Sequence, residues 1–301
     1  MFMRAETFER RMQILKRRAV PVISLAEAVK RFQQGAIENA ETVITFDDGW
    51  SSTLSIGAPI LERFKYPACV YVTTEHLEVG AEVFNVALSY MIRRSGRQTI
   101  ELVGLHPKLD GIYDVVTSPD AAIRALIIAA EEAYPLAARQ RLLPEIARVL
   151  GFDIKEVLRD GRFQLLSTAE LQALAQRGMD IELHTHSHRL PRDKFELMAR
   201  EIEQNREALS RVLGTRPRHF CYPSGDHGEE QPEWLRKLGI ESATTCDPGL
   251  NDDKTSIMLL KRFLDSEQTS DLEFEAEICG VRELLRRLRS SPRRLLGFGA
   301  S

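Results

Sequence analysis

Short apolar runs alternate with amphipathic segments along most of the chain. Residues 42–46 and 68–72 are almost entirely apolar, and runs of this length are typical of buried strands. Between them, residues 54–65 repeat apolar positions at the spacing of a helix. Repeated strand-then-helix units form parallel sheets, so the pattern predicts an α/β protein.

The same alternation continues later in the chain. Four further apolar runs predict strands, at residues 179–183, 219–222, 242–245 and 258–263. A capping box of Ser167 and Glu170 begins one helix, and residues 200–213 have the apolar spacing of another. Near the N-terminus, residues 21–25 predict a strand that leads into a helix capped by Ser24.

Two regions break this cadence. Residues 80–165 hold amphipathic segments without clear strand partners, so we predict a helical insertion within a main domain of residues 1–270. The insertion either packs on the flank of the domain or covers a binding groove. Residues 271–301 are predicted to form a basic C-terminal helix and tail, in which four arginines share one face: Arg282, Arg286, Arg289 and Arg293. Such a face is solvated, or it contacts an anionic membrane surface or a partner protein.

Composition narrows the class of protein. The 41 Lys and Arg residues nearly balance the 44 Asp and Glu residues, which gives no sign of a nucleic-acid-binding surface. No apolar run approaches the roughly 20 residues of a membrane-spanning helix, and the charged N-terminus lacks the apolar core of a signal peptide. From the sequence as given we expect a cytoplasmic protein, although its N-terminus could be incomplete; the oligomeric state stays open.

Residue types that bind metals follow two of the predicted strands. Asp47 and Asp48 come directly after the first strand, and His184-Thr185-His186-Ser187-His188 comes after the strand of residues 179–183. One carboxylate and two imidazoles leave positions on a divalent ion for water and substrate, which is typical of a catalytic site. Either cluster alone is also compatible with a turn or a solvated surface. The combination predicts metal-assisted hydrolysis.

Three motifs together resemble those of the polysaccharide deacetylases, the NodB-homology group or carbohydrate esterase family 4. The motifs are Thr45-Phe46-Asp47-Asp48-Gly49, His184-Thr185-His186-Ser187-His188, and Phe220-Cys221-Tyr222-Pro223-Ser224-Gly225. The resemblance covers roughly residues 5–265. It implies a distorted (β/α) barrel of about seven strands, interrupted here by the helical insertion.

The resemblance also implies a role for each residue of the site. Asp48, His184 and His188 would hold a divalent metal. Zinc is expected, and cobalt, nickel or manganese is also compatible with these ligands. Asp47 would be the catalytic base that accepts a proton from water. Backbone amides around Tyr222, Pro223 and Ser224 would stabilise an oxyanion, because a Pro-Ser-Gly turn exposes its N–H groups.

Two departures from the family pattern affect the chemistry. Many members have an arginine in the third motif that orients the base, and Cys221-Tyr222-Pro223 has none. Many also have a late histidine that acts as general acid, where this chain has Leu259-Leu260-Lys261-Arg262. Arg262 could orient Asp47 or stabilise charge. His227 could replace the acid if its loop folds inwards.

These residues predict a metal-dependent hydrolase that removes N-acetyl groups from amino sugars of a polysaccharide or a glycan precursor. One alternative is a related deformylase or deacylase of a smaller compound. Another is a carbohydrate-binding protein of the same fold that has lost turnover. The missing acid histidine favours the binding protein, whereas the intact pair of Asp47 and Asp48 favours the enzyme.

Overall fold

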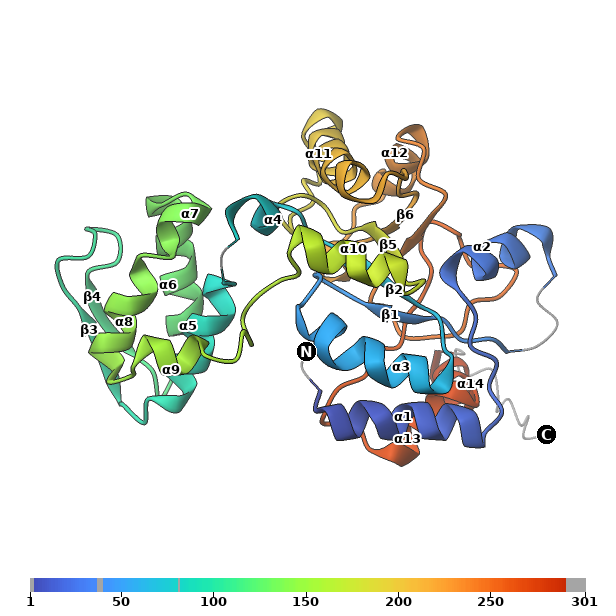
Figure 1. Ribbon diagram of the computed structural model, residues 1–301, viewed down its shortest axis with the longest axis horizontal. Coiled ribbons are helices and arrows are strands. Elements are labelled where there is room, and N and C mark those ends of the chain that lie inside the picture. Colours follow the sequence, from blue (N-terminus) through green and yellow to red (C-terminus); the bar gives the residue numbers. More distant parts are fainter. Residues whose placement is uncertain (1–2, 37–39, 81, 291–301) are drawn as a thin grey trace, which may run out of the picture.

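The fold is built on a parallel sheet of five strands in the order β1-β2-β5-β6-β7. It is seen in a computed structural model, which describes residues 3–36, 40–80 and 82–290 (Figure 1). The strands are β1 (Ile44–Phe46), β2 (Ala68–Val72), β5 (Asp180–Leu183), β6 (His219–Cys221) and β7 (Ser242–Thr244). All five side chains of β2 are buried, as expected for a central strand covered on both faces.

Helices cover the curled sheet on its outer side (Figure 1). They are α1 (Ala5–Arg17), the π-helical turn η1 (Thr53–Gly57), α3 (Ala58–Phe64), α10 (Thr168–Gln176), α11 (Phe195–Leu213) and α12 (Gln231–Lys237). Their apolar faces share one core with the sheet, in which Leu183, Ile202 and Phe220 have no exposed surface. Helix α2 (Leu25–Gln34) packs on the opposite face of the sheet, where Leu25 and Val29 cluster with Cys69, Tyr71 and Cys221. The α/β class with a parallel sheet is therefore confirmed.

Two predicted edge strands are reduced to single bridges. Residues 21–25 contribute only the bridge from Val22 to Thr42, and residues 258–263 only the bridge from Leu260 to Thr244. Both bridges are parallel and continue the sheet at its two edges, so the fold is a curled half-barrel of five strands, consistent with a distorted barrel. The resemblance implied a barrel of about seven strands, and the apolar pattern predicted these two short contacts as full strands.

The predicted capping residues at the starts of two helices are confirmed, whereas the predicted bounds of one strand and one helix differ from the structure. Ser24 accepts from the Glu27 amide at the start of α2, and Ser167 with Glu170 forms a reciprocal capping box at α10. The strand expected over residues 42–46 is shorter, and its side chains are only partly buried. The helix expected over residues 200–213 begins earlier, at Phe195 in α11.

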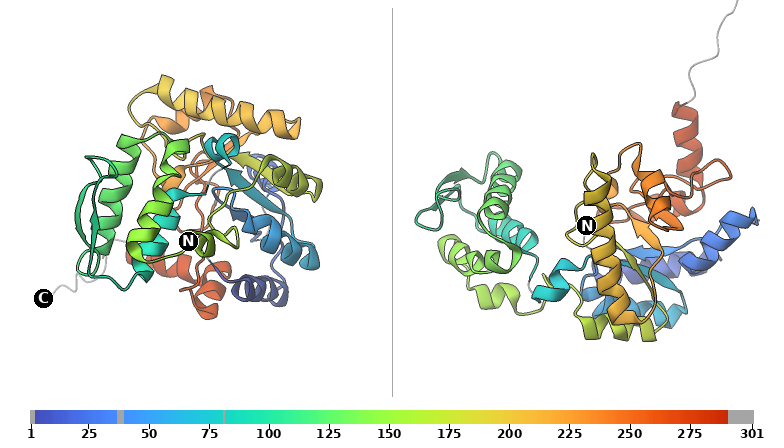
Figure 2. Two further views of the ribbon diagram at one scale, coloured as in Figure 1. Left: turned by 60° about the vertical axis from the view of Figure 1, so that its left-hand side comes forward. Right: turned by 90° about the horizontal axis from the view of Figure 1, so that it is seen from above.

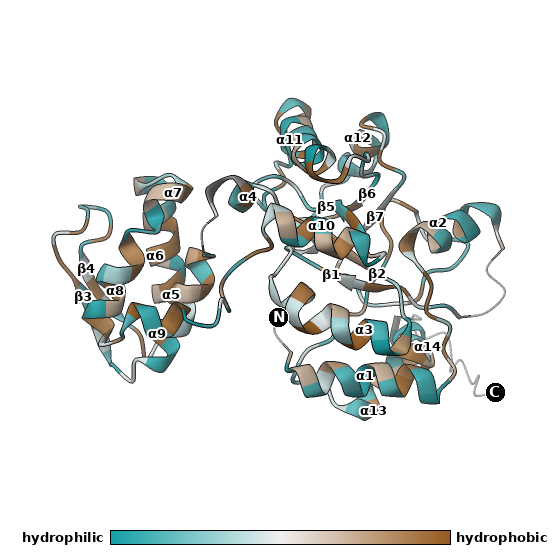
Figure 3. Ribbon diagram, in the orientation of Figure 1, coloured by the Kyte–Doolittle hydropathy of each residue, from teal (hydrophilic) through white to brown (hydrophobic). Residues whose placement is uncertain are grey.

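The insertion forms a second body with its own apolar core. It contains α5 (Phe84–Arg94), β3 (Thr99–Leu102), β4 (Gly111–Asp114), α6 (Pro119–Ala133), α7 (Leu136–Arg139), α8 (Leu142–Leu150) and α9 (Ile154–Leu158). Figure 3 shows apolar residues gathered between these helices, where Leu88, Leu126 and Ile146 are fully buried. The antiparallel hairpin of β3 and β4 was not predicted.

The insertion lies to one side of the sheet (Figure 1) and is joined to it through α4 (Glu75–Val79) and a returning segment. The two connections run side by side, because Glu82 and Gln164 form an antiparallel bridge. A second contact joins Glu131 of α6 to Arg189, the residue directly after the histidine cluster. The insertion therefore reaches the edge of the histidine cluster.

The C-terminal helix α13 (Asp271–Ile278) packs on α1, and α14 (Val281–Ser290) packs on α13. The Arg11 side chain is buried and joins the two ends of the chain: its Nε lies 2.8 Å from Asp265, and it also pairs with Asp271. The predicted tail with Arg293 lies outside the described residues. No helix among the described residues combines the length and the apolarity needed to cross a membrane.

Candidate metal centre

The acidic pair and the histidine cluster follow the two strands that flank β2. Asp47 and Asp48 come directly after β1, and His184 comes directly after β5. Because all these strands are parallel, their carboxyl ends meet at one edge of the sheet, where α/β folds place their sites. The topology thus brings together residues that are 136 positions apart.

The backbone turns sharply at three points of this edge. Asp48, Thr185 and His188 have φ angles of 68°, 62° and 58°, in the left-handed region. Such non-glycine residues cost about 1–3 kcal/mol each and cluster at functional sites. At His188 the backbone turns back towards His184, and the two ring centroids lie 5.0 Å apart.

Asp48, His184 and His188 present their donor atoms to one another. Asp48 Oδ1 lies 3.3 Å from Nε2 of His184 and 3.2 Å from Nε2 of His188. In His184 and Asp48 the second polar atom of the side chain, which faces away from this group, is also bonded. His184 Nδ1 contacts the Cys221 carbonyl oxygen at 2.8 Å, and the Trp50 indole N–H donates to Asp48 Oδ2 at 3.1 Å. Such outer bonds orient ligands and fix the histidine tautomer.

The electrostatics of this group favour a bound cation. Burial would raise the pKa of Asp48, but the hydrogen bonds and charges of His184 and His188 hold it well below its ordinary value. Burial would lower the pKa of His184, but the sulfur of Cys221 and the nearby carboxylates raise it. The site therefore stabilises positive charge. A divalent ion with neutral imidazoles supplies that charge, so the three side chains fit a metal.

Asp47 faces a different partner. Its two carboxylate oxygens accept from the Arg262 guanidinium at 2.7 and 2.8 Å, a bidentate pair. Arg262 is itself fixed, because its Nε donates to the Thr245 carbonyl at 2.8 Å and a terminal nitrogen donates to Thr45 at 3.1 Å. Burial would raise the pKa of Asp47, but the bonds and charge of Arg262 lower it. Asp47 is therefore anionic and oriented.

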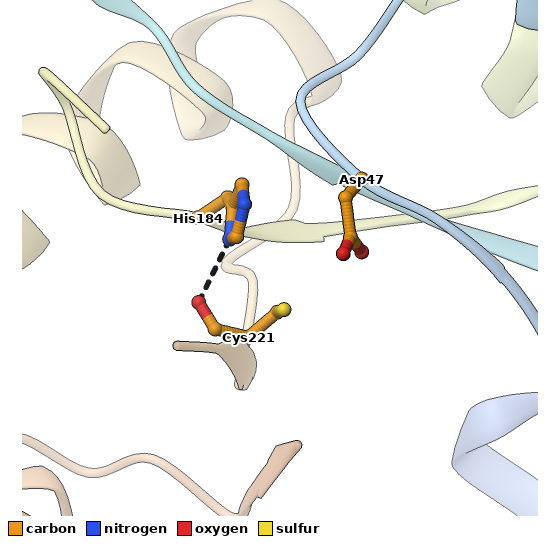
Figure 4. Close-up of side chains that lie close together, drawn as sticks. All are labelled: Asp47, His184 and Cys221. Atoms are coloured by element: carbon orange, nitrogen blue, oxygen red, sulfur yellow. Dashed lines mark hydrogen bonds between the residues drawn. The ribbon is translucent and has the colours of Figure 1, made fainter. Parts of the chain in front are cut away.

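A second group of donor atoms lies close by, from Asp47, His184 and Cys221 (Figure 4). It is a poor cation site. Arg262 already occupies both oxygens of Asp47 and lies 3.0 Å from the Cys221 sulfur, so its charge opposes a metal there. His184 also commits Nδ1 to the Cys221 carbonyl. The group of Asp48, His184 and His188 is the better metal centre.

The turn after β6 supports only part of the predicted oxyanion site. The Tyr222 amide donates to the Thr244 carbonyl at 3.0 Å, and its side chain is buried in the core. Pro223 has no N–H, and the Gly225 amide bonds within the turn. The prediction was therefore wrong for the amides of Tyr222 and Pro223. Ser224, exposed at φ 58°, keeps the one amide in this turn without an assigned partner among the described residues.

Among the described residues, no side chain at the site takes the place of the missing late histidine as general acid. The His227 ring packs on Tyr222, with centroids 5.2 Å apart, and does not join the metal group. His76 lies within reach of the charges of His188 and Asp48. Burial and the charges of Arg139 and His188 lower the pKa of His76 to about 4, so it is neutral near pH 7.

Asn205 is a supporting residue that the motifs did not indicate. It is fully buried in α11, where its Oδ1 accepts from the His184 amide at 3.0 Å. Its amide group donates to the Val72 carbonyl at 2.9 Å and to Thr74 at 3.1 Å, which ties the ends of β2 and β5 together. The available signal was a polar residue between Ile202 and the next apolar position of one helical face.

Comparisons with known proteins agree with this description. The model of the polysaccharide deacetylase family matches residues 146–243, which include both histidine ligands and the third motif. Similar structures include the Streptococcus pyogenes deacetylase PplD in complex with acetate, at 14% identity and a TM-score of 0.60, covering 92% of this chain and 87% of that one. The family match and the shared fold are similarities to polysaccharide deacetylases that agree with the arrangement of the motifs.

Two further structures share the fold. IcaB from Ammonifex degensii is 17% identical with a TM-score of 0.58, covering 91% of this chain and 88% of that one. A de-N-acetylase from Aggregatibacter actinomycetemcomitans is 12% identical with a TM-score of 0.53, covering 90% and 88%. No curated protein matches the chain significantly in sequence.

Proposed function

We propose that this protein is a metal-dependent N-deacetylase of amino sugars in a polysaccharide or a glycan precursor. The observation that carries the proposal is a three-ligand group of Asp48, His184 and His188 beside an arginine-held carboxylate, Asp47. The match of residues 146–243 to the polysaccharide deacetylase family supports carbohydrate deacetylation in general. Two proteins of similar fold are described as a deacetylase with acetate and as a de-N-acetylase, which supports the N-acetyl substrate.

A divalent ion held by these three ligands would act as a Lewis acid toward water and the amide carbonyl. Two imidazoles and one carboxylate suit zinc, and cobalt, nickel or manganese would bind the same donors. We propose zinc. Cys221 and Trp50 contribute by holding the outer atoms of His184 and Asp48, which keeps the donor set in one geometry.

Asp47 is the general base of the proposed reaction. It is anionic and immobilised, so it can accept a proton from water as the water oxygen attacks the acetyl carbon. Arg262 supplies the orientation that an arginine of the third motif gives in many family members. The bridge from Leu260 to Thr244 places Arg262 at this edge of the sheet, although the segment forms no full strand.

The leaving amine needs a proton when the carbon–nitrogen bond breaks. Arg262 cannot supply it, because a guanidinium does not release its proton in this pH range. Asp47 holds a proton after the first step, and we assign its return to the amine nitrogen to the same carboxyl group. The Ser224 amide is the group best placed in its turn to donate to the oxyanion.

The substrate class is tested by product release from a panel. N-acetylglucosamine oligosaccharides should release acetate, whereas N-formyl sugars and small acylated amines should react far more slowly. Preference for the small compounds would favour the deformylase or deacylase. Oligosaccharide binding without release of any acid, unchanged in Asp47→Asn, would favour a binding protein.

A further inference from the structure

Helix α14 presents its apolar face to solvent. Val281, Leu284, Leu285 and Leu288 recur at the spacing of one helical face and are 50%, 59%, 48% and 64% exposed. An amphipathic helix on a protein surface normally buries this face against the core. Figure 2 shows α14, in red, at the edge of the molecule and away from the insertion.

The polar face of α14 is the one that packs on the protein. Glu283 is 8% exposed and Glu277 of α13 is 6% exposed. Arg286 donates to both carboxylate oxygens of Glu277 at 2.9 Å, and Arg287 lies 3.0 Å from Asp252. These ion pairs fix the rotation of the helix, so the apolar face is held outward.

The charge of this segment differs from that of the rest of the chain. Residues 281–301 contain six arginines and one glutamate, a formal charge of +5, while the whole chain carries −3 and residues 1–280 therefore carry −8. Arg289, which is exposed, borders the apolar face along the helix, as does Arg282, which is 42% exposed and lies 3.2 Å from Glu277. A second copy docked on this face would oppose two segments of the same charge. An anionic surface with an apolar interior complements both properties.

We propose that the exposed face of α14 binds the surface of a lipid bilayer that contains anionic lipids. The helix lies in the plane of the surface, with its leucines among the acyl chains and Arg282 and Arg289 at the level of the phosphates. The sequence suggested that a basic face would make such a contact. In the structure the apolar face of α14 is the one exposed for this contact. Arg286 and Arg287 instead form ion pairs that hold the helix to the protein. The inference does not depend on the proposed function.

Flotation of the full chain with vesicles tests the proposal. Vesicles of phosphatidylglycerol and phosphatidylcholine in equal amounts should bind the protein, and added salt should weaken binding. Phosphatidylcholine alone should bind about thirtyfold more weakly, because Arg282 and Arg289 each contribute about 1 kcal/mol near an anionic surface. Equal binding to both vesicles would overturn the anionic part of the proposal.

A pair of variants separates α14 from general surface apolarity. Leu284→Asp with Leu288→Asp should abolish vesicle binding, and thermal unfolding should change little because both side chains are exposed. The matched control is Val103→Asp with Ile112→Asp; Val103 comes directly after β3, Ile112 lies on β4, and they are 75% and 72% exposed. The control should bind like the unmodified chain. Retained binding by the α14 variant would contradict the proposal, as would a dimer in solution that only this variant dissociates.

Discussion

Asp47 and Arg262 are 215 residues apart in the chain, yet they form the bidentate ion pair at the centre of the site. The guanidinium both orients the carboxylate and lowers its pKa against the effect of burial. A lysine at this position would keep the charge but lose the planar pair of donors. We therefore expect the planar guanidinium of Arg262, and not its charge alone, to be needed for activity.

Arg262→Lys should reduce kcat/KM about 10- to 100-fold, since misplacing a catalytic group by about 1 Å costs this much. The pKa of Asp47 should rise, because its strongest stabilising partner is weakened. The acid side of the pH–rate profile should therefore move to higher pH. Steady-state acetate release across pH measures both effects, with the exposed Arg236→Lys as the control. A variant with reduced stability but an unchanged pH profile would contradict the positioning role.

Trp50→Phe tests whether the indole N–H holds the metal ligand. The substitution removes the donor to Asp48 Oδ2 and keeps an aromatic ring. Loss of such an outer bond typically weakens metal affinity 10- to 100-fold. Competition with a zinc-binding dye measures the affinity for zinc. Trp234 packs on Phe195, and Trp234→Phe is the matched control. Equal zinc affinity in both variants would show that Trp50 does not orient Asp48.

The sequence allowed the choice of Asp47, Asp48, His184 and His188 because each lies in a short motif at a strand end. Arg262 stands where a histidine was expected and was predicted to orient Asp47 or stabilise charge, and the bidentate contact between the two side chains agrees with the first of these roles. Trp50 has no sequence signature of its role, and Asn205 has only that of a polar residue on an otherwise apolar helical face. The amides near Tyr222 were misassigned because their use in sheet bonding is a property of the folded backbone.

Among the elements, the central strands were predictable and the edges were not. β2 is a continuous apolar run buried on both faces, so its limits follow directly from composition. The edge segments are governed by other bonds: Pro21 cannot donate to a ladder, and the Lys261 amide donates to the Asn251 side chain instead of a strand. An apolar run therefore overestimated strand length at both edges.

His219 in β6 should make stability depend on pH. Burial and the charge of Arg218 lower its pKa to about 4, against the opposing charge of Glu241. The unfolded state binds the proton more readily, so this stabilisation is complete above pH 6.5 and is lost as the pH falls towards 4, by up to about 3 kcal/mol. Urea unfolding of the protein and of His219→Gln from pH 7 to pH 4 measures the difference. A parallel pH dependence in the two proteins would contradict this assignment.

At the scale of the whole molecule, the sequence indicated an interruption at residues 80–165 but not its internal structure. The hairpin of β3 and β4 was missed because β4 does not alternate: its apolar Ile112 is 72% exposed. The contact between the N-terminal helix and the C-terminal segment was also not predictable from the sequence. It depends on Arg11, a charged residue that is 1% exposed and contacts Asp265 and Asp271.

Arg11→Ala should lower the free energy of unfolding by about 3–5 kcal/mol, because it leaves the Asp265 carboxylate partly buried without its partner. Arg10→Ala is the control, since Arg10 is 48% exposed and its loss should cost less than about 1 kcal/mol. Urea denaturation measures both. Similar losses in the two variants would contradict a role for Arg11 in closing the fold.

The central claim is that Asp48, His184 and His188 hold a catalytic metal for which Asp47 is the base. It is tested most directly by metal content and acetate release, measured on the same samples of the protein and of Asp47→Asn after reconstitution with zinc. We predict one equivalent of metal in both samples, and acetate from N-acetylglucosamine oligosaccharides only with Asp47 present. Absence of metal from the unmodified protein, or full activity in Asp47→Asn, would contradict the account.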